Sequence, residues 1–244
     1  MKFSVLSNAS ARLIRPVRLW NFLGTLGFLG AVSLPGSAQQ ILLSPGNLIG
    51  GGASYYGSFD SGVYSADKVL NQQTGAITDI QGYDMWLGED GASSGYFVLD
   101  LGAAYKLDRI DLVNTHNEFY NDRGTDAFTI LVSNSITDAG EVTEGVPLGM
   151  DLVSPVTLLT GTLTFWLYEE TPVIDVFSSS SFVSGASGTA WRYLLFRFDS
   201  INGGAGGGLN EIRLYTAIPE PSTFALLAGV ACLGLAAMRR PRRG

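Results

Sequence analysis

A short segment in the middle of the chain combines amide, imidazole, guanidinium and aromatic side chains. Its polar members are Asn114, His116, Asn117 and Arg123, and Phe119 and Tyr120 stand among them. Such polar groups make the directional hydrogen bonds that recognise vicinal hydroxyls, and an aromatic ring stacks on a sugar face. The segment is therefore a candidate glycan site. The alternative is that the asparagines close turns, that Asp122 and Arg123 form a local ion pair, and that His116 is an ordinary surface group.

Three tryptophans, Trp86, Trp166 and Trp191, either form a sugar platform or fill the core. Trp86 and Trp191 lie in or beside segments of alternating hydrophobicity, which favours core packing. The segment around Trp166 leaves both alternatives open. We therefore count Trp166 among the candidate ligand-binding residues.

Neighbouring carboxylates occur at three places: Glu89-Asp90, Glu141 with Glu144, and Glu169-Glu170. Glycosidases need two carboxyl groups flanking the scissile bond, so a carbohydrate-active hydrolase is one alternative to a binding protein. Such neighbours also arise without catalysis in an acidic chain, and consecutive residues of a strand point to opposite faces. A Ser-His-Asp triad would depend on the single histidine, His116. We expect a binding or structural protein and not an enzyme.

The charge of the chain is unevenly distributed. Residues 39–218 carry seven basic against 21 acidic side chains, a net charge of −14, whereas the whole chain has a net charge of −7. Such a domain repels phosphate backbones, so nucleic acid is not an expected partner. An acidic surface suits a secreted, soluble protein and offers carboxylates to calcium. The single cysteine, Cys232, lies outside this region, which excludes an intramolecular disulfide, and a single histidine restricts zinc sites.

Residues 1–38 have the features of a secretory signal peptide. Four basic residues come first: Lys2, Arg12, Arg15 and Arg18. An apolar run over 19–34 and the small residues Gly36 and Ala38 follow, which predicts cleavage before Gln39 and export of the protein. The alternative is a membrane anchor that is not cut, but the run is shorter than the roughly 20 residues that a membrane-spanning helix needs.

The C-terminal segment 219–244 has three parts. Pro219, Glu220 and Pro221 precede an apolar stretch over 224–238, and four arginines follow it. The basic cluster would stay on the cytoplasmic side of a membrane. This tail resembles the PEP-CTERM sorting signal of bacteria that make extracellular polymers. The resemblance implies a transient inner-membrane anchor through 224–238 and an exosortase that cuts near the Pro-Glu-Pro motif and delivers the body to the cell surface or the extracellular space.

The body, residues 39–218, has the size of one β-sandwich. Apolar residues alternate with polar ones in short runs, and clusters of Gly, Asn, Asp and Ser separate these runs. We expect strands at 97–101, 109–112, 127–132, 163–168, 173–177, 191–198 and 211–215. Many short strands without helices between them predict an all-β fold, an antiparallel sandwich or jelly roll. The glycine-rich segment 202–208 is expected to be a flexible loop.

Several motifs of the body, taken together, resemble the discoidin or coagulation factor 5/8 type C family of galactose-binding-like jelly rolls. They are ADKVLN (66–71), Trp86, GYFVLDLG (95–102), IDLVN (110–114), FTILVS (128–133), RYL (192–194) and LNEIRLY (209–215). The resemblance spans 53–216. The chain departs from the family at Asn71-Gln72, where an Asp-Gly pair is common, and at 137–187, which is longer and more irregular.

The resemblance also implies a structural calcium site between the early loop and the final strand. The matching positions are Asn71, Thr74 and Glu211, with Asp67 nearby. Oxygen ligands of this kind suit calcium rather than zinc. The alternative is that Glu211 makes an ordinary ion pair or a hydrogen bond at the strand end.

These observations favour an exported cell-surface or extracellular-matrix protein that binds carbohydrate, with an extracellular polysaccharide and an exosortase as its expected partners. Two alternatives remain open: a structural matrix protein without a small ligand, and a carbohydrate-active hydrolase.

Overall fold

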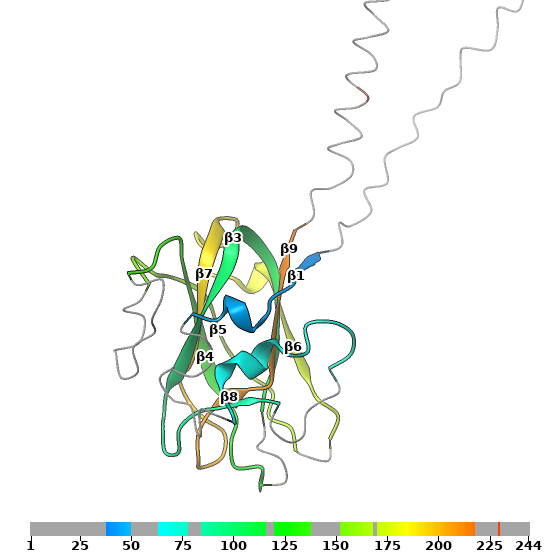
Figure 1. Ribbon diagram of the computed structural model, residues 1–244, viewed down its shortest axis with the longest axis vertical. Coiled ribbons are helices and arrows are strands. Elements are labelled where there is room, and N and C mark those ends of the chain that lie inside the picture. Colours follow the sequence, from blue (N-terminus) through cyan, green and yellow to red (C-terminus); the bar gives the residue numbers. More distant parts are fainter. Residues whose placement is uncertain are drawn as a thin grey trace, which may run out of the picture. The chain divides into compact units, whose positions relative to one another are not determined.

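The computed structural model describes residues 38–49, 63–77, 84–115, 120–137, 152–167, 170–217 and 229 (Figure 1). Residues Pro35–Pro221 form one compact unit. Except for Ala38, the signal peptide predicted at 1–38 lies outside the described residues, as does the Pro219-Glu220-Pro221 motif; of the segment 219–244 only residue 229 is described. None of the helices in the described part of the chain has the length and hydropathy that crossing a membrane requires.

The described part of this unit contains nine strands and three 3-10 helices. The strands are β1 (Gln39–Ile41), β2 (Trp86–Leu87), β3 (Gly95–Val113), β4 (Ala127–Ser133), β5 (Val156–Thr162), β6 (Ile174–Ser178), β7 (Ala190–Phe198), β8 (Gly208–Leu209) and β9 (Glu211–Thr216). The helices are η1 (Pro45–Asn47), η2 (Ala66–Leu70) and η4 (Ser179–Ser181).

The strands form two antiparallel layers that share β3. One layer has the order β1-β9-β3-β6, and the other has the order β3-β7-β4-β5. The short strands β2 and β8 make a separate antiparallel pair. The predicted all-β fold, an antiparallel β-sandwich, is confirmed.

The long strand β3 passes from one layer to the other at a bend. Its register shifts between Asp100 and Tyr105 against β7, and between Leu107 and Arg109 against β9. Within the bend, Gly102 has a φ of +80°, in the left-handed region that favours glycine. Irregularities of this kind bend a strand and increase its twist. The bend therefore defines one end of the sandwich, which we call the bend end, and both ends of β3 lie at the opposite end.

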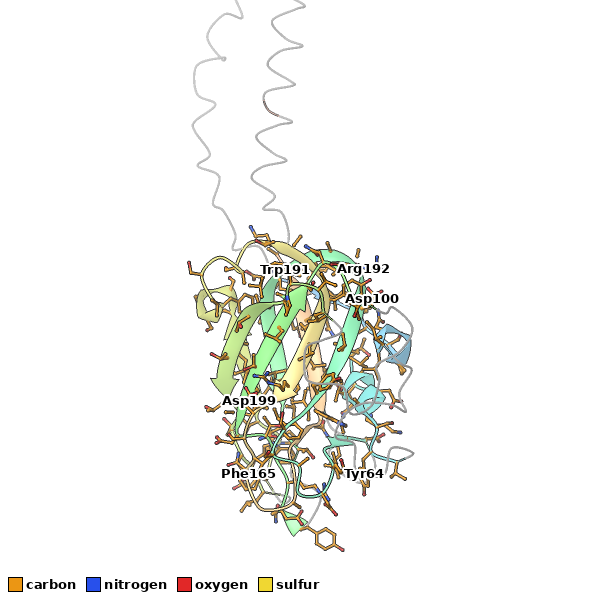
Figure 2. All side chains as sticks on the ribbon, turned by 90° about the vertical axis from the view of Figure 1, so that its left-hand side faces the viewer. Tyr64, Asp100, Phe165, Trp191, Arg192 and Asp199 are labelled. Atoms are coloured by element: carbon orange, nitrogen blue, oxygen red, sulfur yellow. The ribbon has the colours of Figure 1, made fainter. Side chains whose placement is uncertain are left out.

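Asp100 and Arg192 stabilise the bend. Oδ1 of Asp100 accepts a hydrogen bond of 2.8 Å from the backbone N–H of Gly102, and both carboxylate oxygens accept bonds of 2.9 Å from Arg192. The bond from Arg192 lowers the pKa of Asp100, although partial burial acts in the opposite direction. Figure 2 shows both residues with Trp191 at one end of the sandwich, and Phe165 near the other.

The core between the layers is rich in aromatic rings. Trp86 makes an edge contact with Phe97, whose ring stacks on Phe196 at a centroid distance of 5.4 Å, and Phe196 stacks in turn on Phe128. The expected core position of Trp86 is confirmed, because the residue is buried. Trp191 is partly buried and packs against the same cluster. These rings bury much of the apolar surface that drives folding.

The burial of β3 is more extensive than the alternating pattern predicts. Val98, which alternates with core-facing residues of β3, is buried together with Tyr96 in a second apolar cluster that includes Ile49 and Leu152. The strand therefore has both faces covered in this region. The prediction of a strand at 163–168 is wrong, because residues 163–167 have no regular structure. The strand in this part of the chain is β5, which ends before residue 163.

Candidate functional site

Three loops meet at the end of the sandwich opposite the bend. They comprise residues 87–92 before β3, 120–126 before β4 and 200–208 after β7, and together we call them the loop end. Backbone hydrogen bonds join each pair of neighbouring loops: Gly88 N–H to Gly207 O (2.7 Å), Gly91 N–H to Ala205 O (2.7 Å), Gly124 N–H to Gly206 O (3.1 Å) and Ala205 N–H to Asp122 O (3.0 Å). The loops therefore form one connected layer.

The glycine-rich segment of the loop end is tightly packed. A Cβ atom at Gly203 would lie 2.7 Å from the backbone of Asp122, and Gly203 has a φ of +85°. A Cβ atom at Gly208 would collide with the carbonyl oxygen of Trp86. The glycines thus allow this segment to approach its neighbours closely. The expectation of a flexible loop did not include this close packing.

Arg123 links two of the three loops from inside. The residue is only 3% exposed, and its Nη1 donates a hydrogen bond of 2.6 Å to the carbonyl of Gly88. Its Nη2 pairs with the carboxylate of Asp90, whose side chain is largely exposed. Because the guanidinium is buried against the first loop, Arg123 supports the loop end rather than presenting its fork to a ligand.

Asn114 has a similar supporting role at the end of β3. The residue is buried, and its Nδ2 donates to the carbonyl oxygens of Thr125 (2.8 Å) and Thr164 (3.3 Å). Its Oδ1 accepts from the N–H groups of Thr115 and Thr125. The side chain amide thus forms hydrogen bonds through both donor and acceptor, and it fixes the loop that contains Arg123.

The remaining predicted ligand-binding residues divide into two groups. Trp166 is 1% exposed and packs against Val113, with Ile77 and Val173 beside it, so it is a core residue and not an exposed sugar platform. His116 and Asn117 lie outside the described residues, and their roles stay predictions.

Tyr120, one of the two aromatic residues expected to stack on a sugar, is the most exposed aromatic residue in the described part of the chain, at 66%. It directly precedes the segment that Arg123 and Asn114 fix. Glu89 and Asp90 are exposed on the neighbouring loop. The loop end thus combines an exposed ring with hydrogen-bond acceptors, whereas Asn114 and Arg123, singled out by their residue types, are buried supports.

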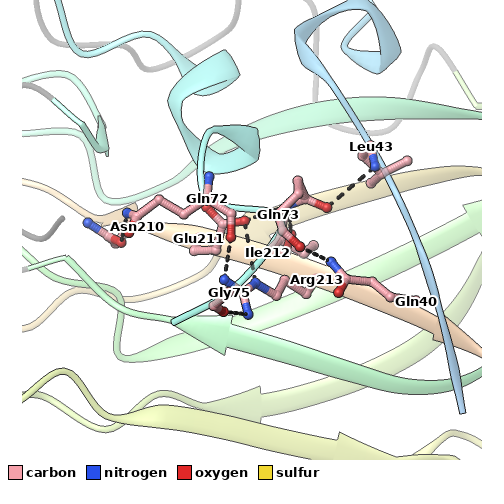
Figure 3. A network of polar contacts seen from close by, with 9 residues as sticks. All are labelled: Gln40, Leu43, Gln72, Gln73, Gly75, Asn210, Glu211, Ile212 and Arg213. Carbon is pink, nitrogen blue, oxygen red and sulfur yellow. Dashed lines mark hydrogen bonds and ion pairs between the residues drawn. The ribbon is translucent and has the colours of Figure 1, made fainter. Parts of the chain in front are cut away.

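The predicted calcium ligands lie in or near a polar network between the turn after η2 and the start of β9 (Figure 3). Glu211 is buried; its two carboxylate oxygens accept hydrogen bonds from the backbone N–H of Gln72 (3.1 Å) and from Nε2 of Gln73 (2.5 Å). Burial raises the pKa of Glu211 to about 8, while these bonds and the charge of Arg213 act in the opposite direction. The expected alternative, a hydrogen-bonded carboxyl at the strand end, describes this arrangement.

The other predicted ligands have different surroundings. Asn71 is exposed, and its Nδ2 donates to Asp84 at 3.1 Å; Thr74 is exposed as well. Asp67 accepts a hydrogen bond from the hydroxyl of Ser65. Among the described residues, no group of three or more His, Cys, Asp or Glu side chains could hold a metal ion. The calcium site stays a prediction.

The carboxylate pairs considered for catalysis are dispersed. Asp90 pairs with Arg123, and Glu170 accepts a hydrogen bond from the N–H of Leu167. Glu141, Glu144 and Glu169 lie outside the described residues. Residues 91–95 match the Gly-x-Ser-x-Gly pattern of hydrolases, but this segment leads into β3 and not into the helix that a nucleophile elbow requires.

No protein-family profile matches the chain, and no curated protein matches it either. Among solved structures, the third family 32 carbohydrate-binding module of a family 31 glycoside hydrolase from Clostridium perfringens is similar, with 14% identity over 71% of this chain and 94% of that one and a TM-score of 0.46. The family 32 module of NanJ from C. perfringens, solved with galactose, has 14% identity over 73% and 98% and a TM-score of 0.44. The N-terminal domain of the single-strand break repair protein XRCC1 has 14% identity over 75% and 100% and a TM-score of 0.45.

Proposed function

We propose that the chain is an exported protein of the cell surface or extracellular matrix whose β-sandwich binds an extracellular polysaccharide through the loop end. The observation that carries this proposal is the exposed ring of Tyr120 on a loop that buried hydrogen bonds hold in place. Because the backbone that follows Tyr120 is held in place, little backbone entropy would be lost when the ring stacks on a sugar.

The chemistry of the loop end fits a neutral polyol better than an anion. The exposed carboxylates of Glu89 and Asp90 accept hydrogen bonds from sugar hydroxyls and repel phosphate or sulfate groups. In the described part of the loop end, the arginine Arg123 is buried and paired with Asp90. We therefore expect a neutral polysaccharide as the ligand.

The positions of the first and last strands of the body support attachment to a surface. Gln39 pairs with Thr216, so the body begins and ends at adjacent positions. Thr216 donates a hydrogen bond to the carbonyl of Lys106, which places both positions at the bend end. The described chain therefore enters β1 and leaves β9 at the bend end, opposite the loop end. This arrangement suits the proposed signal peptide at 1–38 and exosortase processing at 219–244.

The experiment is co-sedimentation of the purified full chain with the neutral exopolysaccharide of its producing organism. We expect saturable binding, and a loss of at least tenfold in affinity for Tyr120→Ala, because one sugar–aromatic contact contributes on the order of 1.4 kcal/mol or more. Val176→Ala, which shortens an exposed apolar side chain on β6, is the matched control and should bind normally.

Two results would contradict the proposal. Equal binding by the wild type and Tyr120→Ala would remove the loop end as the site. Absence of binding to any polysaccharide fraction, combined with self-association of the chain, would instead favour the structural matrix protein.

A further inference from the structure

A buried polar cluster joins the turn after η2 to the start of β9, on the layer that contains β1. The turn comprises residues 72–75, and its position depends on side chains from β9 more than 130 residues later in the chain. Figure 3 shows the carbonyl groups of Gln72 and Gly75 directed toward the Arg213 side chain.

Arg213 places its guanidinium among the oxygen atoms of the turn. Nη1 donates a hydrogen bond of 3.0 Å to the carbonyl of Gly75, and Nη2 donates to the carbonyl of Gln72. Nε lies 3.9 Å from Oε1 of Glu211. The Arg213 side chain is only 10% exposed and the Glu211 side chain is fully buried. Two backbone carbonyls and one carboxyl group thus surround a positive charge that belongs to the chain itself.

Gln73 holds the same turn from the other side. Its Nε2 donates to Glu211 and to the carbonyl of Ile212 (2.7 Å), and its backbone carbonyl accepts from Nε2 of Gln40 in β1. The cluster therefore ties η2 to both β9 and β1. A cation in this cluster has a structural effect, because it gives hydrogen-bond donors to partly buried carbonyl groups and links them to the final strand.

The residues present do not fit a calcium ion. Calcium takes six to eight oxygen ligands at roughly 2.3–2.6 Å. Here the carbonyls of Gln72 and Gly75 already accept hydrogen bonds from Arg213, and both oxygens of Glu211 accept bonds from amide groups. A divalent ion added beside a buried guanidinium would meet strong repulsion in a region of low dielectric constant.

We infer that Arg213 is the resident cation of the turn 72–75, and that this turn is held to the final strand without a calcium ion. The Arg213 side chain connects the turn to the final strand, as a bound ion would. Unlike a bound ion, it cannot dissociate, so the stability of this region does not depend on the calcium concentration outside the cell.

The first test compares the melting temperature of the purified full chain in EDTA and in excess calcium chloride. We expect the same melting temperature in both, and no saturable heat signal when calcium is titrated into the EDTA-treated protein. A higher melting temperature in calcium than in EDTA, or saturable calcium binding that EDTA abolishes, would overturn the inference.

The second test removes the guanidinium with Arg213→Met, which keeps most of the side-chain volume. Loss of the hydrogen bonds from Arg213 to the carbonyls of Gln72 and Gly75 should lower the melting temperature by roughly 5 °C or more. The matched control is Arg192→Met, which removes an exposed arginine that also pairs with a carboxylate, and should change it by less than about 2 °C. Equal effects of the two substitutions would contradict a structural role for the Arg213 charge.

If Arg213→Met does not fold, Arg213→Lys tests the two carbonyl contacts while the positive charge is retained. A lysine ammonium is a single point charge and does not reproduce the fork that reaches both carbonyls. We expect a folded variant with a lower melting temperature than the wild type. A lysine variant as stable as the wild type would show that the paired carbonyl contacts are dispensable, and would overturn this part of the inference.

Discussion

Arg123 donates a hydrogen bond of 2.6 Å to the carbonyl oxygen of Gly88, which lies 35 residues earlier in the chain. The bond is buried, and it joins the first loop of the loop end to the second. Because the same guanidinium also pairs with Asp90, one side chain determines where the exposed carboxylate of that loop lies. The geometry of the loop end therefore depends on a residue that is itself almost inaccessible to a ligand.

Replacing Arg123 should weaken both stability and polysaccharide binding. Arg123→Ala leaves the carbonyl of Gly88 without this donor, and we expect a loss of roughly 1–3 kcal/mol in the free energy of unfolding. The measurement is urea denaturation of the full chain. Arg197→Ala is the control, because Arg197 pairs with Asp199 at a more exposed position on β7. Equal losses for the two variants would show that the buried link contributes nothing beyond a surface ion pair.

The glycine-rich segment offers a matched pair of substitutions. Gly208→Ala should destabilise the fold by about 1–3 kcal/mol or more, because the new methyl group would collide with the carbonyl oxygen of Trp86. A Cβ atom at Gly204 would have no neighbouring atom within 4 Å, so Gly204→Ala should change the free energy by no more than about 0.5 kcal/mol. Thermal denaturation of both variants tests this. Similar melting temperatures would contradict the close packing of this segment.

The buried carboxyl of Glu211 should make stability depend on pH. Its pKa is about 8 in the folded protein, against 4.5 for the ordinary group, so the folded state binds more protons between these values. The contribution of Glu211 to the free energy of unfolding should therefore be greatest below about pH 4.5 and fall as the pH rises toward 8, by up to about 1.4 kcal/mol per pH unit. Urea titrations across this range measure the slope.

Glu211→Gln is the variant that isolates this group, because it removes the titration and keeps a similar shape. Burial also raises the pKa of Asp111, which adds a contribution of the same sign to the wild type and to the variant. The prediction therefore concerns the difference between the two profiles. If Glu211→Gln loses stability with rising pH as steeply as the wild type does, the buried carboxyl is not the cause.

The sequence predicts the sandwich because most of its core residues follow a local period of two. The apolar positions Phe97 and Leu99 of β3 and Phe128 and Ile130 of β4 all face the core, as the alternation indicates. The covering of Val98 was not predictable from this pattern, since the residues that bury it, such as Leu152, come from distant segments. Burial by distant parts of the chain leaves no local signal.

Contacts with distant parts of the chain also explain why several predicted ligand-binding residues are buried. Asn114 and Arg123 have the residue types that bind sugars, but tertiary hydrogen bonds with Thr125 and Gly88 use these groups to hold the loops. Trp166 is buried against Val113, a contact that the sequence around it does not indicate. The contact between Arg213 and the turn 72–75 joins residues about 140 positions apart, and no local motif announces it.

Hydrogen exchange of the full chain, measured with and without the neutral exopolysaccharide, shows whether the loop end binds this ligand. We predict that the polysaccharide slows exchange in peptides covering the loop end, residues 87–92, 120–126 and 200–208, and that Tyr120→Ala removes this protection. Peptides from β6 serve as the internal reference and should not change. Protection on β6 or at the bend end, without protection at the loop end, would show that the polysaccharide does not bind at the loop end.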